Sequence, residues 1–303
     1  MRLLTRMVAL FVLLMVTMTS RVEAKINVVT TTQDPAAITM AIGGDRVVVT
    51  TLCKGYQDPH FLDAKPSYMV DLNRADLVEY IGLELEVGYL PSLLAGARNP
   101  KLAPGQPGNL DLSRSITPLE TSGSADRSQG DIHPSGNPHY WLDPENGRLM
   151  ARAIAARLTD LDPAGKTTFA ANLATFESTL TQKEAEWATR MAPFAGKPIV
   201  TYHRSWTYFA ARYHLVVVDF VETKPGIPPT PAHTLDLLKL IPAKGVKVIL
   251  MENFYDRRVP DVIASKTGAK VASVPNSVNG EEGVDTYFKL MDRLVSEMEK
   301  AMK

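Results

Sequence analysis

A long helical repeat in the middle of the chain limits what this sequence can fold into more than any other feature. Between residues 163 and 194, large apolar side chains return every three or four positions, with one gap. That spacing places them on one face of an α-helix. At 1.5 Å per residue, a helix from Pro163 to about Met191 is roughly 45 Å long, the width of a domain or more. We therefore predict a helix that forms the spine of the fold. The repeating residues are Phe169, Leu173, Phe176, Leu180, Trp187, Met191 and Phe194.

On both sides of this helix, short apolar runs rich in β-branched residues alternate with helical segments. Such alternation is typical of α/β folds with parallel sheets. We predict two α/β lobes, at residues 25–162 and 193–303, joined by a linking helix at 163–192. Strands are predicted at residues 26–32, 47–53, 77–81, 199–202, 215–221, 246–251 and 270–274, with shorter pieces near Leu102 and Ile116. Helices are predicted at residues 34–44, 66–74, 144–161, 206–213, 230–243, 260–267 and 282–302, with a short amphipathic segment at 87–94.

The first 24 residues are typical of a secretory signal peptide. Arg2 and Arg6 precede a short apolar run at residues 7–18, and small residues end at Ala24. The run is too short to span a bilayer comfortably. We predict removal of residues 1–24 and export to the periplasm.

Charge and cysteine content exclude some classes of protein. The 33 basic and 33 acidic residues balance, and loss of the first 24 residues would leave a net charge of −2. Nothing in this balance favours nucleic acid or an anionic membrane as a partner. The one cysteine, Cys53, ends an apolar run and is predicted to be a buried small hydrophobic residue. No lipid-anchor cysteine follows the predicted cleavage site, so we expect no membrane anchor.

Histidines are the best candidates for a functional site, although no local motif such as HExxH, CxxC or GxSxG accompanies them. Ligands bind beyond the carboxyl ends of strands in open parallel sheets. His60 follows the strand at 47–53, and His203 ends the strand at 199–202. His139 lies just before a helix that we predict to start at Asp143-Pro144, a cap followed by a proline in the first turn.

A carboxylate is available to join these imidazoles. Glu252 ends the predicted strand at 246–251, and three histidines with one carboxylate form a tetrahedral set for Zn²⁺. Two other histidines are predicted to have no part in the site. His214 is expected to be a structural, partly buried residue, and His233 to lie on a solvated helix face. His133 follows a polar surface loop at 121–128 and is predicted to be exposed, with an outer, transient metal contact as the alternative.

Three segments together resemble the metal-binding proteins of bacterial zinc and manganese ABC importers. They are GYQDPHF around His60, GNPHYWLDPENGR around His139 and TYHRSWTYFAARY around His203. The resemblance covers the predicted mature chain. It implies two α/β lobes with parallel sheets flanked by helices, one long rigid linking helix, little hinge motion, and a metal site in the cleft between the lobes. Histidine at the third position, as in His203, is typical of zinc binders of this family, and glutamate of manganese binders.

Two features depart from the family pattern. An aspartate ligand usually follows the last strand, but here that region reads SVPNSVN, with Asn276 as a weak substitute. The fourth ligand is therefore Glu252, Asn276 or water, with a supporting role toward a ligand histidine as the alternative for Glu252. A histidine-rich loop found in many zinc members is also missing, and its stretch holds only His133.

The resemblance implies a monomeric periplasmic protein that captures Zn²⁺ and delivers it to a membrane permease, without catalysis. The metal site is predicted at His60, His139, His203 and Glu252, with Mn²⁺ as the second choice of metal. Rival hypotheses are an exported zinc hydrolase, since three histidines with an open water position would suit one, and a metal-chaperone or adhesion role.

Overall fold

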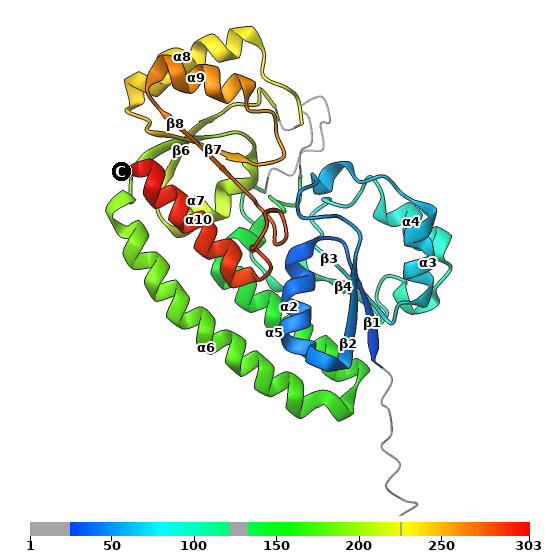
Figure 1. Ribbon diagram of the computed structural model, residues 1–303. Coiled ribbons are helices and arrows are strands. Elements are labelled where there is room, and N and C mark those ends of the chain that lie inside the picture. Colours follow the sequence, from blue (N-terminus) through cyan, green and yellow to red (C-terminus); the bar gives the residue numbers. More distant parts are fainter. Residues whose placement is uncertain (1–24, 122–132, 225) are drawn as a thin grey trace, which may run out of the picture.

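The chain folds into two α/β lobes that each contain one parallel sheet (Figure 1). The computed structural model describes residues 25–121, 133–224 and 226–303. The predicted signal peptide and almost all of the predicted loop at 121–128 lie outside these ranges. The first sheet has the order β2-β1-β3-β4, and the second has the matching order β6-β5-β7-β8. The α/β prediction with parallel sheets is confirmed. The strands are β1 (Ile26–Thr30), β2 (Val47–Thr51), β3 (Leu77–Tyr80), β4 (Asn109–Asp111), β5 (Pro198–Thr201), β6 (Val216–Phe220), β7 (Val248–Glu252) and β8 (Lys270–Val274).

Helices cover both faces of each sheet, as crossover connections between parallel strands require. In Figure 1, α3 and α4 lie on one side of the first sheet and α2 on the other, while α8 and α9 cover the outer face of the second. The helices are α2 (Gln33–Gly43), α3 (Pro66–Arg74), α4 (Leu90–Ala97), α5 (Pro144–Leu161), α6 (Lys166–Met191), α7 (Thr207–Arg212), α8 (Pro231–Lys244), α9 (Arg258–Thr267) and α10 (Tyr287–Met302). Among the described residues, none of the helices is both long enough and apolar enough to cross a membrane.

The predicted spine is α6, a helix of 26 residues that runs along both lobes (Figure 1). It begins three residues later than predicted, because Pro163–Gly165 forms a separate 3-10 turn capped by Asp162. Near its start, Asn172 donates a hydrogen bond to the Ile42 carbonyl of α2 in the first lobe. Near its end, the indole of Trp187 donates to Asp292 of α10. The helix therefore fastens to both lobes. The predicted division of the chain at residues 163 and 192, near the ends of this helix, stays a proposal.

Buried contacts between the lobes add to this connection. Asp34, at the start of α2, accepts hydrogen bonds from the Ser277 hydroxyl at 2.6 Å and the Val278 amide at 3.0 Å. The Trp141 indole donates to the Asn276 carbonyl at 2.7 Å. One continuous apolar core includes residues of both lobes. Separating the lobes as rigid bodies would therefore expose apolar surface and unpair buried polar groups.

Some element boundaries differ from the predicted ones. The fourth strand of the first sheet is Asn109–Asp111, whereas the apolar residue Leu102 packs from a 3-10 turn and Ile116 follows another. The predicted segment at 87–94 is the helix Leu90–Ala97, and the last helix begins only at Tyr287. Cys53 is buried, as predicted.

Candidate metal centre

His60, His139 and His203 come together where the two lobes meet. One ring nitrogen from each lies within 4.8 Å of the others, and the ring centroids of the three pairs are 5.2 to 5.3 Å apart. His60 lies in the turn Pro59–Phe61 after β2, and His139 precedes the turn Tyr140–Leu142. His203 follows β5 of the second lobe. The two lobes thus contribute to one cluster at the carboxyl ends of their strands.

Asp58 orients His60. Its Oδ1 accepts a hydrogen bond from the His60 Nδ1 at 2.7 Å and from the His60 amide at 3.0 Å. Burial by itself would raise the pKa of Asp58, but its interactions with His60 outweigh burial and lower the pKa to about 2. A carboxylate that stays ionised keeps the proton of His60 on Nδ1, so that Nε2 carries the free lone pair.

Asn137 orients His139 in a similar way. Its Oδ1 accepts hydrogen bonds from both the His139 amide and the His139 Nδ1, each at 2.9 Å. The assignment of oxygen and nitrogen in this amide is fixed, because its Nδ2 faces the Glu120 carboxylate and the Arg204 carbonyl, which are both acceptors. Burial first, and the nearby histidines second, lower the pKa of His139 well below its ordinary value of 6.5. His139 is therefore neutral at pH 7.

The segment around His139 is tied down on several sides. Tyr140 donates a hydrogen bond to the Ile81 carbonyl at 2.7 Å. Asp143 caps α5 by accepting from the Glu145 amide, as predicted, and also forms two contacts with Arg212 at 2.6 and 2.9 Å. A buried histidine in such a segment has few alternative positions.

Glu222, two residues after β6, orients His203. Its Oε2 accepts from the His203 Nδ1 at 2.8 Å, and both side chains are buried. Burial lowers the pKa of His203, but the hydrogen bond to Glu222 and the charges of Glu222, Glu252 and Asp58 outweigh burial and raise it. Sequence reasoning missed Glu222. The only available signal was a carboxylate directly after an apolar strand, in the unusual VETKPGIPPTPAH segment.

A fourth histidine contacts one member of the cluster without being part of the group of atoms within 4.8 Å. His133, predicted to be exposed, is half-buried, and its Nε2 lies 3.2 Å from the Nε2 of His60. Its Nδ1 donates to the Leu83 carbonyl at 2.9 Å. Leu83 and Glu84 both have left-handed backbone conformations, which the buried Glu86 supports by accepting from two amides just before them. The prediction of an exposed His133 is wrong, because this turn of the first lobe supplies its acceptor.

The hydrogen bonds of the four histidines have one common consequence. Each Nδ1 faces an oxygen acceptor, so in the neutral ring Nδ1 carries the proton and Nε2 is a bare lone pair. Facing lone pairs, as in His60 and His133, repel unless a cation or a shared proton lies between them. Tetrahedral Zn²⁺ with Zn–N bonds of about 2.05 Å places its nitrogens roughly 3.3 Å apart. The His60–His133 distance of 3.2 Å matches that value, and the three clustered nitrogens lie within 4.8 Å of one another.

Glu252 and Asn276 lie near the cluster without joining it. Glu252 is fully buried at the end of β7 but is not part of the group of atoms within 4.8 Å. Burial raises the pKa of Glu252 to about 7, against the opposing effects of His203 and the Ser205 hydroxyl. Neither Glu252 oxygen makes a hydrogen bond of ordinary geometry to a described residue. The role of Glu252 as a ligand stays a prediction. Asn276 contributes its carbonyl to Trp141.

The predicted assignments of His214 and His233 also need correction. His214 is exposed and has a left-handed backbone in the turn before β6, so it is not a partly buried structural residue. His233 is half-buried, and its Nε2 donates to the Phe220 carbonyl at 2.7 Å.

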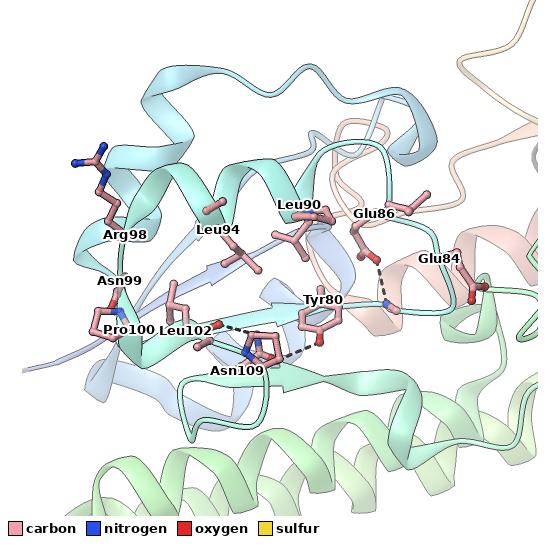
Figure 2. A pocket seen from close by; sticks show the side chains of 16 residues that line it. Tyr80, Glu84, Glu86, Leu90, Leu94, Arg98, Asn99, Pro100, Leu102 and Asn109 are labelled. Carbon is pink, nitrogen blue, oxygen red and sulfur yellow. Dashed lines mark hydrogen bonds between the residues drawn. The ribbon is translucent and has the colours of Figure 1, made fainter.

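A hollow of about 690 Å³ lies away from the histidines, between α4 and the segment leading to β4 (Figure 2). Its walls are mostly apolar, with Leu90, Leu94 and Leu102 among the lining residues. The Tyr80 hydroxyl at its floor is already paired with Asn109 (Figure 2). A hollow of this size could hold a small molecule, but its lining includes none of the three clustered histidines.

Comparison with known proteins agrees with this fold. A family model described as zinc-uptake complex component A, periplasmic (ZnuA) matches residues 28–301. The chain is 28% identical over 281 residues to the metal ABC transporter substrate-binding lipoprotein ScbA of Streptococcus cristatus, covering 89% of this chain and 86% of that protein. It is also 28% identical over 276 residues to the manganese ABC transporter substrate-binding lipoprotein PsaA of Streptococcus pneumoniae, with coverages of 88% and 86%.

Solved structures show the same architecture. A crystal structure of ZnuA has a TM-score of 0.78 and 25% identity, and the match covers 92% of this chain and 100% of that one. A manganese-bound periplasmic metal-binding protein from candidatus liberibacter asiaticus has the same fold, with a TM-score of 0.75, 22% identity and coverages of 92% and 100%. The chain therefore belongs to the ZnuA family of metal-binding, substrate-binding proteins of ABC importers, which is not an enzyme family.

Proposed function

We propose that this protein binds Zn²⁺ through the Nε2 atoms of His60, His139 and His203 and delivers it to the membrane permease of an ABC importer. The observation that carries the proposal is a set of three imidazoles, each with one ring nitrogen within 4.8 Å of the others, whose Nδ1 atoms are all engaged by acceptors. This arrangement leaves the Nε2 lone pairs free for a metal. Zinc is cargo in this proposal. The imidazoles must be neutral to bind it, so binding competes with protons.

The nitrogen-rich donor set supports zinc as the preferred metal. Imidazole suits Zn²⁺, whereas carboxylate and water oxygens suit Mn²⁺ better. Relatives at 28% identity include proteins named for manganese, so the choice of metal depends on this chain's own donors. His133 is the fourth donor that the 3.2 Å contact with His60 favours. Glu252 or water is the alternative, and coordination by Glu252 would make the site better suited to manganese.

The same donor set supports carriage over catalysis. Catalytic zinc sites keep an open position for water, whereas His133 or Glu252 as a fourth protein donor would close this one. An exported zinc hydrolase would need that open position. We propose that the protein acts as a monomer and is exported by the segment 1–24. The description of its family as periplasmic supports the proposed location.

Metal analysis tests the proposal directly. Purified protein is stripped of metal, reloaded in equal concentrations of Zn²⁺ and Mn²⁺, and its metal content is measured. We expect about one Zn²⁺ per chain, and dominant uptake of Mn²⁺ would overturn the metal assignment.

Variants assign the site to particular residues. His139→Ala should lower zinc affinity by at least roughly 100-fold in a chelator competition, because it removes a buried donor. His214→Asn is the matched control, since His214 is exposed and asparagine tolerates its left-handed backbone. Equal affinities of parent and His139→Ala protein would contradict the proposed site.

A further inference from the structure

Asp58 of the first lobe is shared between a candidate ligand and the second lobe. Its Oδ1 accepts from the Nδ1 of His60 at 2.7 Å, and its Oδ2 accepts from the Tyr255 hydroxyl at 3.0 Å. Tyr255 lies in the turn that follows β7. These bonds form a chain from His60 through one carboxylate to the other lobe, across 197 positions of sequence.

The ring of Tyr255 also rests on the neighbour of a second candidate ligand. It stacks on Tyr202 with a centroid distance of 4.5 Å and an interplanar angle of 18°. Tyr202 directly precedes His203, whose ring centroid is 6.3 Å from that of Tyr255. One side chain of the second lobe therefore contacts the residue that orients His60 and the residue that precedes His203.

We propose that Tyr255 is a positioning residue that couples the relative placement of the two lobes to the orientation of His60, and so to the retention of metal. This inference rests on the proposed function, because it takes His60 as a ligand. A carboxylate with both oxygens engaged has one orientation, and it passes that orientation to the imidazole it accepts from. Displacement of the turn that carries Tyr255 would free Oδ2, loosen Asp58 and weaken the hold on His60.

The surroundings of this bond allow a clean substitution. Asp58 and Tyr255 line a groove of about 330 Å³ between the lobes, together with Tyr56 and Phe61, which are exposed. In Tyr255→Phe, the ring can keep its stacking on Tyr202, and water from the groove can reach the Asp58 Oδ2. The variant therefore removes the link between the lobes without leaving a buried charge unsolvated.

The test measures zinc affinity and zinc release into excess chelator for Tyr255→Phe. Outer partners of metal-bound histidines contribute about 10- to 100-fold to affinity. Tyr255 acts one bond further out, so we expect a loss at the lower end, roughly tenfold, seen mainly as faster release. Tyr56→Phe is the matched control, because it removes the same hydroxyl from an exposed ring of the same groove. It should behave like the parent.

Two further measurements separate positioning from a general structural effect. In the His60→Ala background, Tyr255→Phe should cause no additional loss of affinity, because its effect passes through His60. In metal-free protein, long-range proton–nitrogen NMR should show the His60 Nδ1 proton in the parent and faster exchange of that proton in Tyr255→Phe.

Each outcome has a definite meaning. Parent-like affinity, release and NMR spectra in Tyr255→Phe would overturn the inference, and so would an equal loss in the His60→Ala background. Failure of the parent protein to bind zinc would instead overturn the proposed function, while the metal-free NMR comparison would still decide whether Tyr255 positions His60.

Discussion

Neutralising Glu222 tests whether the buried carboxylate behind His203 strengthens zinc binding. Its Oε2 accepts from the His203 Nδ1 at 2.8 Å and from the Gly226 amide at 3.2 Å. In Glu222→Gln, the amide oxygen can occupy the same place and accept both hydrogen bonds. The substitution therefore removes the negative charge while conserving shape and hydrogen bonding.

The expected magnitude follows from the change in this one hydrogen bond. A hydrogen bond to a charged group contributes about 1.5 to 3 kcal/mol, against about 1 kcal/mol for a neutral pair. The loss of about 0.5 to 2 kcal/mol corresponds to a roughly 2- to 30-fold larger dissociation constant at pH 8. No correction for solvent screening is needed, because both side chains are about 95% buried.

The pH dependence provides a second, sharper signature. Glu222 helps to raise the pKa of His203 above 6.5, so in the parent protein protons compete with metal from a pH above 6.5 downward. Glu222→Gln lowers that pKa, although Glu252 and Asp58 still face His203. The variant therefore loses less affinity on acidification than the parent. The ratio of the two dissociation constants should be largest near pH 8 and should shrink toward pH 5.5.

Chelator competition at several pH values measures both effects. Glu186→Gln is the matched control, since it makes the same change on an exposed part of α6 and should leave affinity unchanged. An unchanged dissociation constant in Glu222→Gln, or a ratio that does not vary with pH, would refute the reasoning.

Three other substitutions test different parts of the structure. His133→Ala should weaken zinc binding by less than His139→Ala, and unchanged affinity would exclude His133 as the fourth donor. Burial raises the pKa of Asp34 from 3.8 to about 7. The folded protein therefore binds this proton more tightly than the unfolded chain, and the protonated carboxyl stabilises the folded state at low pH. Relative to Asp34→Asn, the parent's free energy of unfolding in urea should fall by up to about 4 kcal/mol as the pH rises from 4 to 7. Parallel plots of unfolding free energy against pH for the two proteins would contradict this. Asp143→Ala removes the cap of α5 and the pair with Arg212, and should cost about 1 to 2 kcal/mol in unfolding free energy. If Asp143→Ala and the parent unfold with the same urea midpoint and slope, neither contact contributes to stability.

Much of the fold follows from local signals in the sequence. The helices Pro66–Arg74 and Pro144–Leu161 have the predicted bounds, because proline in the first turn and the capping residue Asp143 act within a few residues. The alternation of apolar runs and helices predicted the parallel sheets, since each lobe buries its strands on both faces. β4 was not predicted, because its three residues form a strand only by pairing with β3.

The positions of His60 and His203 after strands marked them as candidate ligands, because parallel strands of a sheet present their carboxyl ends at one edge. The family resemblance of the three histidine segments predicted that His139 joins them between the two lobes. The sequence by itself thus determined the two-lobed α/β architecture, the long connecting helix and the three histidines that cluster. What surrounds them was decided by tertiary structure alone. Glu222 is 19 positions from His203, His133 is 73 from His60, and Tyr255 is 197 from Asp58. No local spacing encodes such pairs. They arise where crossover connections and the packing of two lobes bring distant loops together, and there the orientation of each imidazole is set.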